Sequence, residues 1–274
     1  TILGNIFAQT QQIISYPLPD TLSFAGEKVP LEDQDLRERL SREIDQNVYK
    51  QAATLLILKR ANRWQTELSK ILKAEGIHED FFYLAIAESE LDEYAVSAKE
   101  ALGFWQFLAP TAKENGLEVS TYVDQRKDPI AATYAACKYL KVAYKKFGNW
   151  ACAAASYNRG MAGFDKAVQG QKTSNYYEMY LNRETYRYIP RILALKVILE
   201  NPEKYGFFLK KEQKYAPFDY REIVVNASIS DLAAWAIEQG SNYKVLKIYN
   251  AWLDSSDYTF VVPKGKTYTF RLPK

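Results

Sequence analysis

Residues 81–112 read FFYLAIAESELDEYAVSAKEALGFWQFLAPTA, and this stretch decides the fold class that we expect. It opens with an apolar run, Phe81–Ala87, which predicts a buried helix with Glu88 at its end. Further on, Gly103 and Gln106 stand among bulky apolar residues. Burial disfavours the ionised form of a carboxyl group, and the negative end of a helix acts in the same direction. We therefore expect Glu88 to stay protonated near neutral pH, as a general acid for a glycosidic bond must.

From Glu88 alone, a solvated surface glutamate is the commoner interpretation, because glutamate side chains are rarely fully buried. The neighbouring acids Glu90, Asp92 and Glu93 are interpreted in that way, as solvated residues at the end of the helix. Acids with a perturbed pKa mark functional sites only on average. The rest of the chain must therefore decide between the two interpretations of Glu88.

The composition is that of a globular protein with many aromatic rings. A chain of 274 residues has room for a sizeable core, in one large or two modest domains. A net charge of +3 without a dense Lys/Arg stripe argues against nucleic acid as a partner. The 21 Tyr, 13 Phe and 5 Trp suit a carbohydrate cleft, since sugars offer apolar C–H faces and hydroxyls, although most of these rings are expected in the core.

Several function classes lose their usual sequence support. The chain has no HExxH, Walker, GxGxxG or GxSxG pattern, and its single histidine, His78, excludes a His-rich metal site. Two cysteines, Cys137 and Cys152, make no disulfide scaffold, and we expect two buried free thiols. The sequence contains no run of 18 apolar residues, so it predicts no membrane-spanning helix. The chain starts at Thr1 without a signal pattern, so we expect that any export signal has been removed.

Helical spacing covers most of the chain as far as residue 201. Apolar residues recur four apart from Leu36 to Val48, and a longer helical pattern ends at Gly76. The clearest helix runs over 129–147, where Asp128 precedes Pro129 as an N-cap and a glycine follows. The next helix is capped by Asn149, and Pro190 implies a kink or a late start in the last helix.

Beyond Pro202 the composition changes to a mixed α/β tail. A linker-like stretch leads to the strand-like segment 223–225, and helical patterns follow at 228–239 and 244–250. Two further strand-like segments are YTFVV at 258–262 and YTFRL at 268–272. This tail is therefore expected to form a unit distinct from the helical body.

Four motifs occur in a specific order: Glu88-Ser89, Gly103-Phe104-Trp105-Gln106, Ala155-Ser156-Tyr157-Asn158, and Glu184-Thr185 followed by Tyr188-Ile189-Pro190. Together they resemble the lysozyme-like lytic murein transglycosylases of the soluble-transglycosylase type. The likeness is greatest to the membrane-bound lytic murein transglycosylase D group, in versions typical of Bacteroidetes. The resemblance implies a mainly α fold, with a lysozyme-like helical domain of the goose-type lysozyme/transglycosylase kind followed by a small α+β LysM-like domain.

The resemblance implies a role for each matched residue. It makes Glu88 the single catalytic acid/base and Tyr188 the tyrosine whose hydroxyl hydrogen-bonds the catalytic carboxyl. The residues that it implies for binding substrate or shaping the groove are Ser89, Ser97, Gly103, Phe104, Gln106, Tyr157, Asn158 and Tyr188. It implies no cofactor and no metal. Taken singly, each of these residues has a structural interpretation as a buried amide, a core ring or a turn.

The implied reaction cleaves the β-1,4 bond between N-acetylmuramic acid and N-acetylglucosamine in peptidoglycan glycan strands. One glutamate acts first as acid and then as base, and 1,6-anhydromuramoyl ends result. Plain hydrolysis on the same fold and a catalytically dead wall-binding module are the alternatives. The substrate implies a periplasmic protein, with an outer-membrane tether through the removed signal as one arrangement. We expect a monomer.

We expect four parts along the chain. These are an N-terminal arm at 1–30, a lysozyme-like catalytic domain at 31–207, a linker at 208–222 and a LysM-like module at 223–274. The module resembles a degenerate LysM in its order of strand, two helices, Asn250, Pro263-x-Gly265 and closing strand. LysM modules bind glycans that contain N-acetylglucosamine, and a purely structural domain packed on the body is the alternative interpretation.

Overall fold

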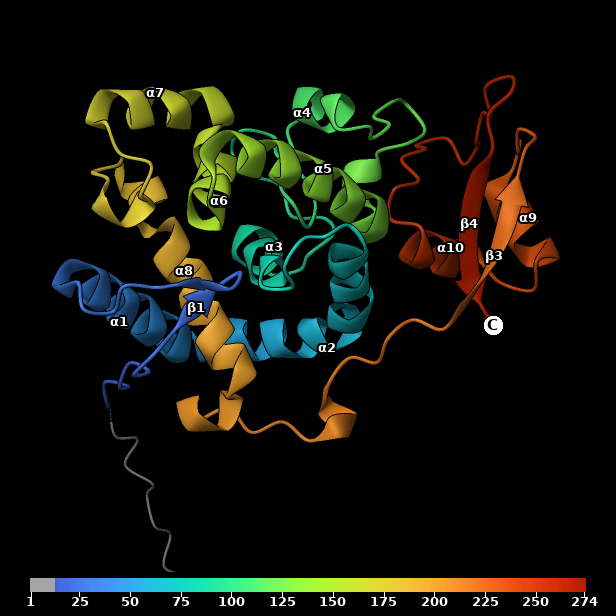
Figure 1. The fold of residues 1–274 in the computed structure, drawn as a ribbon. Coiled ribbons are helices and arrows are strands. Elements are labelled where there is room, and N and C mark those ends of the chain that lie inside the picture. Colours follow the sequence, from blue (N-terminus) through green and yellow to red (C-terminus); the bar gives the residue numbers. More distant parts are fainter. Residues whose placement is uncertain (1–12) are drawn as a thin grey trace, which may run out of the picture.

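The computed structural model describes residues 13–274, which form a helical body and a small two-stranded module (Figure 1). The mainly helical body followed by an α+β module is the predicted fold class, and it is confirmed. Part of the predicted N-terminal arm, residues 1–12, lies outside the described residues. The helices of the body are α1 (Gln34–Tyr49), α2 (Gln51–Ala74), α3 (Phe81–Ser89), α4 (Ala109–Glu114), α5 (Pro129–Phe147), α6 (Trp150–Arg159), α7 (Met161–Gln171) and α8 (Arg183–Glu200), with short 3₁₀ turns η1 (Gln125–Lys127), η2 (Tyr176–Glu178), η3 (Pro202–Tyr205) and η4 (Lys211–Gln213).

Local capping explains where the best-predicted helices begin and end. The Asp128 side chain accepts hydrogen bonds from the first N–H groups of α5, and Gly148 ends that helix with a left-handed backbone at φ 79°. The Asn149 side chain caps α6 in the same way. The last helix, α8, begins well before Pro190, which lies inside it, so a late start at this proline is wrong.

The apolar helix α3 lies near the centre of the body, between α2 on one side and α5 and α6 on the other (Figure 1). Its first six residues are all buried, and it packs against α2 and α8. A helix that is apolar all round is stable only when other elements surround it. The surrounding helices therefore hold the end of α3, and with it Glu88, in a fixed place.

The segment before α1 packs on this body through buried charges. Strands β1 (Ser23–Phe24) and β2 (Glu27–Lys28) form a small antiparallel hairpin. The Asp80 carboxylate is buried, and it accepts hydrogen bonds from the Ala25 N–H and the Lys196 ammonium, both at 2.7 Å. The Glu27 carboxylate accepts from the Trp150 N–H at the start of α6.

The C-terminal module consists of β3 (Tyr220–Val225), α9 (Leu232–Glu238), α10 (Tyr243–Tyr249) and β4 (Tyr268–Pro273), with β3 antiparallel to β4. The predicted strand at 258–262 is wrong, because Phe260 makes only an isolated bridge with Ile229. The buried Asn250 side chain donates to the Leu246 and Arg271 carbonyls and accepts from the Arg271 N–H. This amide therefore fixes the end of α10 to β4.

The module docks on the body through backbone and side-chain contacts. The Asp124 N–H donates to the Trp252 carbonyl at 2.8 Å, and the Asp254 N–H donates to the Tyr122 carbonyl at 3.0 Å. Lys127 pairs with Asp254 at 2.5 Å. The described residues therefore join body and module directly, and not only through the connecting segment.

Two further predictions concern the cysteines and a membrane span. Cys137 and Cys152 are buried free thiols, as predicted. None of the helices within residues 13–274 has the length and apolar character needed to cross a bilayer. The predicted limits of the four parts of the chain stay a prediction, although β3 begins at Tyr220, inside the segment expected to be a linker.

The buried Asp80–Lys196 pair gives a first test of this packing. Lys196→Met leaves Asp80 without its cationic partner and should lower the free energy of unfolding by about 3–5 kcal/mol. Lys28→Met is the control, because Lys28 and Glu32 form an exposed pair and its loss should cost about 1 kcal/mol or less. Urea denaturation of both variants measures the difference. Equal losses would show that the buried pair does not hold the N-terminal hairpin.

Candidate active site

A cleft of about 840 Å³ opens beside the end of α3, with residues of α4, α5, α6 and α8 in its walls. The predicted site residues divide into two groups around it. Those that line it are Glu88, Ser97, Gln106, Tyr157 and Asn158. Those that lie behind its walls are Ser89, Gly103, Phe104 and Tyr188.

Glu88 lines the cleft and is held in an environment that favours its protonated form. Burial of the carboxyl is the largest influence and raises its pKa, and the negative charge of Glu184 acts in the same direction. A hydrogen bond from the Tyr188 hydroxyl and the positive charge of Arg191 oppose this rise without cancelling it. The fold therefore favours the protonated form of Glu88, as expected for an acid at the end of this apolar helix.

The Tyr188 side chain is fully buried and its hydroxyl donates to Glu88 Oε1, across 100 positions of sequence. Burial and the neighbouring Glu88 carboxyl raise the pKa of Tyr188 well above its usual range, so the phenol keeps its proton. The hydrogen bond that the resemblance implied is therefore present. Tyr188 touches the acid and not the cleft.

The loop between α3 and α4 presents Ser97 and Gln106 to the cleft. Gln106 Nε2 donates to the Ala95 and Gly103 carbonyls, each at 2.9 Å, which leaves Oε1 as an acceptor. The Gln106 backbone has a positive φ of 46°, a strained conformation of the kind that is retained at functional sites. Ser97 Oγ accepts from the N–H groups of Lys99 and Ala101, and so shapes the start of the loop.

Ser89 and Phe104 hold this loop against α3, and they are not placed to touch a ligand. The Ser89 hydroxyl is buried and lies 3.0 Å from the Phe104 carbonyl and 3.2 Å from the Ala85 carbonyl. The Phe104 ring is 1% exposed and packs edge-on against Trp64. Both side chains therefore support the wall of the cleft from behind, and their predicted part in binding substrate or shaping the groove stays a prediction.

Tyr157 and Asn158 end α6 at the cleft. Tyr157 lines the cleft, and its hydroxyl donates to the Trp105 carbonyl at 2.7 Å, which fixes the side chain in the wall. The Asn158 amide donates to Glu184 at 3.0 Å and accepts from the Thr185 hydroxyl at 2.8 Å. The Asn158 side chain therefore joins the end of α6 to the first turn of α8.

Glu184 is the cleft residue that sequence reasoning missed. It lines the space, holds Asn158 and raises the pKa of Glu88 through its charge. Glu184 belongs to the fourth motif, next to Thr185, and this was the sequence feature that could have marked it as a site residue. The spacing of residues did not predict that its side chain would face the cleft. Tyr139 and Met161 line the same cleft, and neither belonged to a motif.

The acids that follow Glu88 are not all solvated residues at a helix end. The helix α3 ends at Ser89, and Glu90 reverses the chain with a left-handed backbone, so Asp92 does not lie one helical turn beyond Glu88. Asp92 pairs with Arg60 at 2.8 Å. Glu93 is half-buried and not fully solvated, and this burial raises the pKa of its carboxyl.

Two family models match the chain. Residues 68–180 match the transglycosylase SLT domain, and residues 221–274 match the soluble lytic transglycosylase C-terminal LysM-like domain. These stretches are similar to an SLT transglycosylase domain and to a C-terminal LysM-like domain, in the predicted order. The lysozyme-like character of the body and the predicted limits of the domains stay predictions. The matched part of the SLT domain holds Glu88 to Asn158, whereas α1 and α8, which carries Tyr188, lie outside it.

Two curated relatives match parts of this chain. The chain is 28% identical over 251 residues to the membrane-bound lytic murein transglycosylase D of Escherichia coli strain K12, a match that covers 88% of this chain and 53% of the relative. It is 32% identical over 90 residues to a putative tributyltin chloride resistance protein of Alteromonas sp. strain M-1, covering 32% of this chain and 44% of that protein. The chain thus spans about half the length of the curated relatives it matches. An origin in Bacteroidetes stays a prediction.

Gly103 of the SLT domain has no room for a side chain. Its φ is +79°, and a Cβ would lie 1.9 Å from the Arg126 carbonyl oxygen. Gly103→Ala should therefore lower the free energy of unfolding by at least about 2 kcal/mol. Gly163→Ala, inside α7 with only the flexible Arg159 side chain nearby, should be neutral or stabilise by about 0.5–1 kcal/mol. Thermal denaturation compares them, and similar losses would contradict this account.

The raised pKa of Glu88 makes the stability of the SLT domain depend on pH. Between the unfolded and the folded pKa, the folded state holds a proton that the unfolded chain has lost, so wild-type stability falls as pH rises through this window. Glu88→Gln removes this fall, and its stability relative to wild type should increase over the same window. Urea denaturation at a series of pH values measures the effect. If the exposed control Glu90→Gln showed the same pH dependence, burial of Glu88 would not be its source.

Proposed function

We propose that this protein is a lytic transglycosylase that cleaves the β-1,4 bond between N-acetylmuramic acid and N-acetylglucosamine in peptidoglycan and forms 1,6-anhydromuramoyl ends. The observation that carries the proposal is the half-buried Glu88 carboxyl, with its raised pKa, on the wall of a cleft in a stretch that matches the SLT domain. A raised pKa favours the protonated form, which can give its proton to a glycosidic oxygen.

In the first step Glu88 protonates the glycosidic oxygen, and the bond to the muramoyl anomeric carbon breaks. The leaving N-acetylglucosamine keeps that proton as its 4-hydroxyl, and the substrate's own N-acetyl group stabilises the positive carbon. Glu88 is now a carboxylate, which the Tyr188 hydroxyl and the charge of Arg191 stabilise. Both groups lie in position before the charge develops, as electrostatic catalysis requires.

In the second step the Glu88 carboxylate takes the proton of the muramoyl C6 hydroxyl. The C6 oxygen then bonds to the anomeric carbon and closes the anhydro ring. Glu88 regains its proton, no water is consumed, and the residue is ready for the next bond. The negative charge of Glu184 raises the pKa of Glu88 and so favours this return of the proton.

Substrate binding is assigned to the groups that the cleft leaves available. Gln106 Oε1 can accept from a sugar hydroxyl or N–H, and the Tyr157 ring offers an apolar face. Asn158 and Ser97 are two further polar residues of the walls. Binding of glycan by the LysM-like module, and a periplasmic or outer-membrane location, belong to the same proposal.

A hydrolytic muramidase is the second candidate. It is favoured by Glu184, a second carboxyl on the wall of the cleft that could activate water. Hydrolysis is the weaker candidate because the Glu184 carboxyl already accepts a hydrogen bond from Asn158. The two reactions differ in their products, since hydrolysis leaves reducing muramoyl ends.

Incubation with purified sacculi, followed by mass spectrometry of the released sugars, tests the proposal. Wild type should release anhydromuramoyl products, and Glu88→Gln should lower the rate by at least about 10²-fold. Glu90→Gln, which alters an exposed acid two residues away, should remain active. Reducing ends would establish the hydrolase instead. Binding of sacculi without any soluble product would contradict both enzymes and favour a wall-binding module.

A further inference from the structure

Pro190 lies inside α8, two residues after Tyr188, and removes one backbone hydrogen bond of the helix. Because proline has no N–H, it cannot donate to the carbonyl four residues earlier, that of Tyr186. A buried carbonyl without a partner would cost about 1–3 kcal/mol. The helix turn that carries Tyr188 therefore depends on donors from outside α8.

Two side chains supply those donors. Arg39 of α1 donates through Nη1 to the Tyr186 carbonyl at 2.8 Å, and the buried Tyr176 hydroxyl lies 2.9 Å from the same oxygen and 2.9 Å from the Thr185 carbonyl oxygen. The Arg39 side chain is only 10% exposed, and its guanidinium lies 3.8 Å from the centroid of the Tyr186 ring. Asp35 pairs with Arg39 at 2.5 Å and accepts from the Tyr186 hydroxyl at 2.6 Å.

A second contact from α1 holds Arg187, the residue after Tyr186. Arg187 donates from Nε and Nη2 to the two carboxylate oxygens of Glu43, at 2.7 and 3.1 Å. The Glu43 side chain is 3% exposed, and a two-pronged pair of this kind fixes orientation as well as distance. Residues 186 and 187, which directly precede Tyr188, are thus both tied to α1.

We propose that Arg39 and Glu43 are positioning residues, which aim the Tyr188 hydroxyl at Glu88. Arg39 completes the turn that Pro190 interrupts, and Glu43 holds the Arg187 side chain of the same turn. The proposal rests on the proposed function, in which Glu88 is the acid. Neither residue lines the cleft, so each acts through Tyr188 and not on substrate. Both belong to α1, outside residues 68–180 that match the SLT domain.

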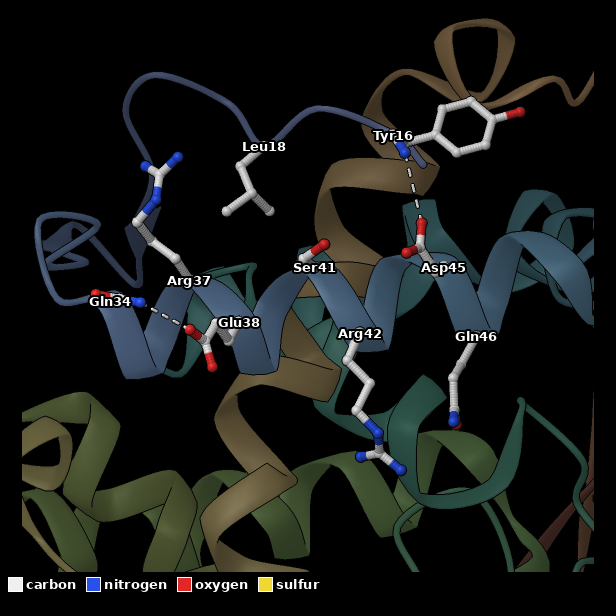
Figure 2. A pocket seen from close by; sticks show the side chains of 9 residues that line it. All are labelled: Tyr16, Leu18, Gln34, Arg37, Glu38, Ser41, Arg42, Asp45 and Gln46. Carbon is white, nitrogen blue, oxygen red and sulfur yellow. Dashed lines mark hydrogen bonds between the residues drawn. The ribbon is translucent and has the colours of Figure 1, made fainter. Parts of the chain in front are cut away.

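The opposite face of α1 offers a matched control. A depression of about 710 Å³ lies on this face. Figure 2 shows Arg37, Ser41 and Asp45 there, projecting from α1 toward the segment that carries Tyr16. Arg37 donates to the Leu31 carbonyl and is exposed, and within residues 13–274 it forms no hydrogen bond or ion pair with α8. Arg37→Met therefore removes the same kind of side chain from the same helix and leaves the contacts of Arg39 and Glu43 with α8 unchanged.

The charged and titratable groups around Glu88 set what the variants should do. They are Tyr188 and Arg191, which lower its pKa, and Glu184, which raises it, with the Tyr157 phenol beside them. If Arg39→Met lets the Tyr188 hydroxyl move away, the pKa of Glu88 should rise further. The upper limb of the pH–rate profile, which requires protonated Glu88, should then move to higher pH.

The experiment measures kcat, KM and pH profiles on glycan strands for Arg39→Met, Tyr176→Phe, Tyr188→Phe and Arg37→Met. Arg39→Met and Tyr176→Phe should lower kcat by about 10-fold or more with KM within about two-fold, since an interaction with the acid is lost and substrate contacts remain. Their upper pH limbs should shift in the same direction as that of Tyr188→Phe. Arg39→Lys keeps one donor and should recover part of kcat, while Arg37→Met should match wild type.

A double-variant cycle makes the test decisive. If Arg39 acts through Tyr188, then Arg39→Met combined with Tyr188→Phe should be no slower than Tyr188→Phe alone. Additive losses, or a loss of stability with kcat and pH profile unchanged, would overturn the proposal. If wild type releases no product at all, the proposed function has failed. The inference is then decided by ¹³C NMR titration of the Glu88 carboxyl, which must move to higher pH in Arg39→Met.

Discussion

The hydrogen bond from Tyr188 to the Glu88 carboxyl joins α8 to α3, and much of the helical body is arranged to keep it in place. Its acceptor is fixed because α3 is apolar and enclosed. Its donor is fixed because Arg39 and Tyr176 complete the interrupted turn of α8. The bond keeps a buried acid from being isolated, so that the acid can both give up and regain a proton.

Locally unfavourable features gather around this bond. A carboxyl is buried at Glu88, Gln106 adopts a positive φ, and Pro190 interrupts a helix. Each would destabilise an isolated element, and each is compensated by contacts from elsewhere in the chain. The Ser89 hydroxyl holds the loop that carries Gln106, for example, and α1 supplies the donor that Pro190 lacks. Packing elsewhere in the fold thus offsets the destabilising features that fix the geometry of this site.

Sequence reasoning succeeded where the decisive interaction is local. The caps at Asp128 and Asn149 act within three residues, so the limits of α5 and α6 could be predicted. The pairing of Tyr188 with Glu88 spans 100 positions and came only from resemblance to a family. Burial of Phe104 and the raised pKa of Glu93 depend on tertiary packing, which no spacing within one element encodes.

Direct titration of Glu88 tests the central claim most simply. In protein labelled with ¹³C at glutamate carboxyls, Glu88→Gln identifies the resonance, and the chemical shift is followed against pH. We expect a titration midpoint above the ordinary range of a glutamate, because burial raises the pKa of Glu88 by more than Tyr188 and Arg191 lower it. A midpoint at or below that range would show that the carboxyl is ionised at neutral pH, and Glu88 could not then serve as the acid.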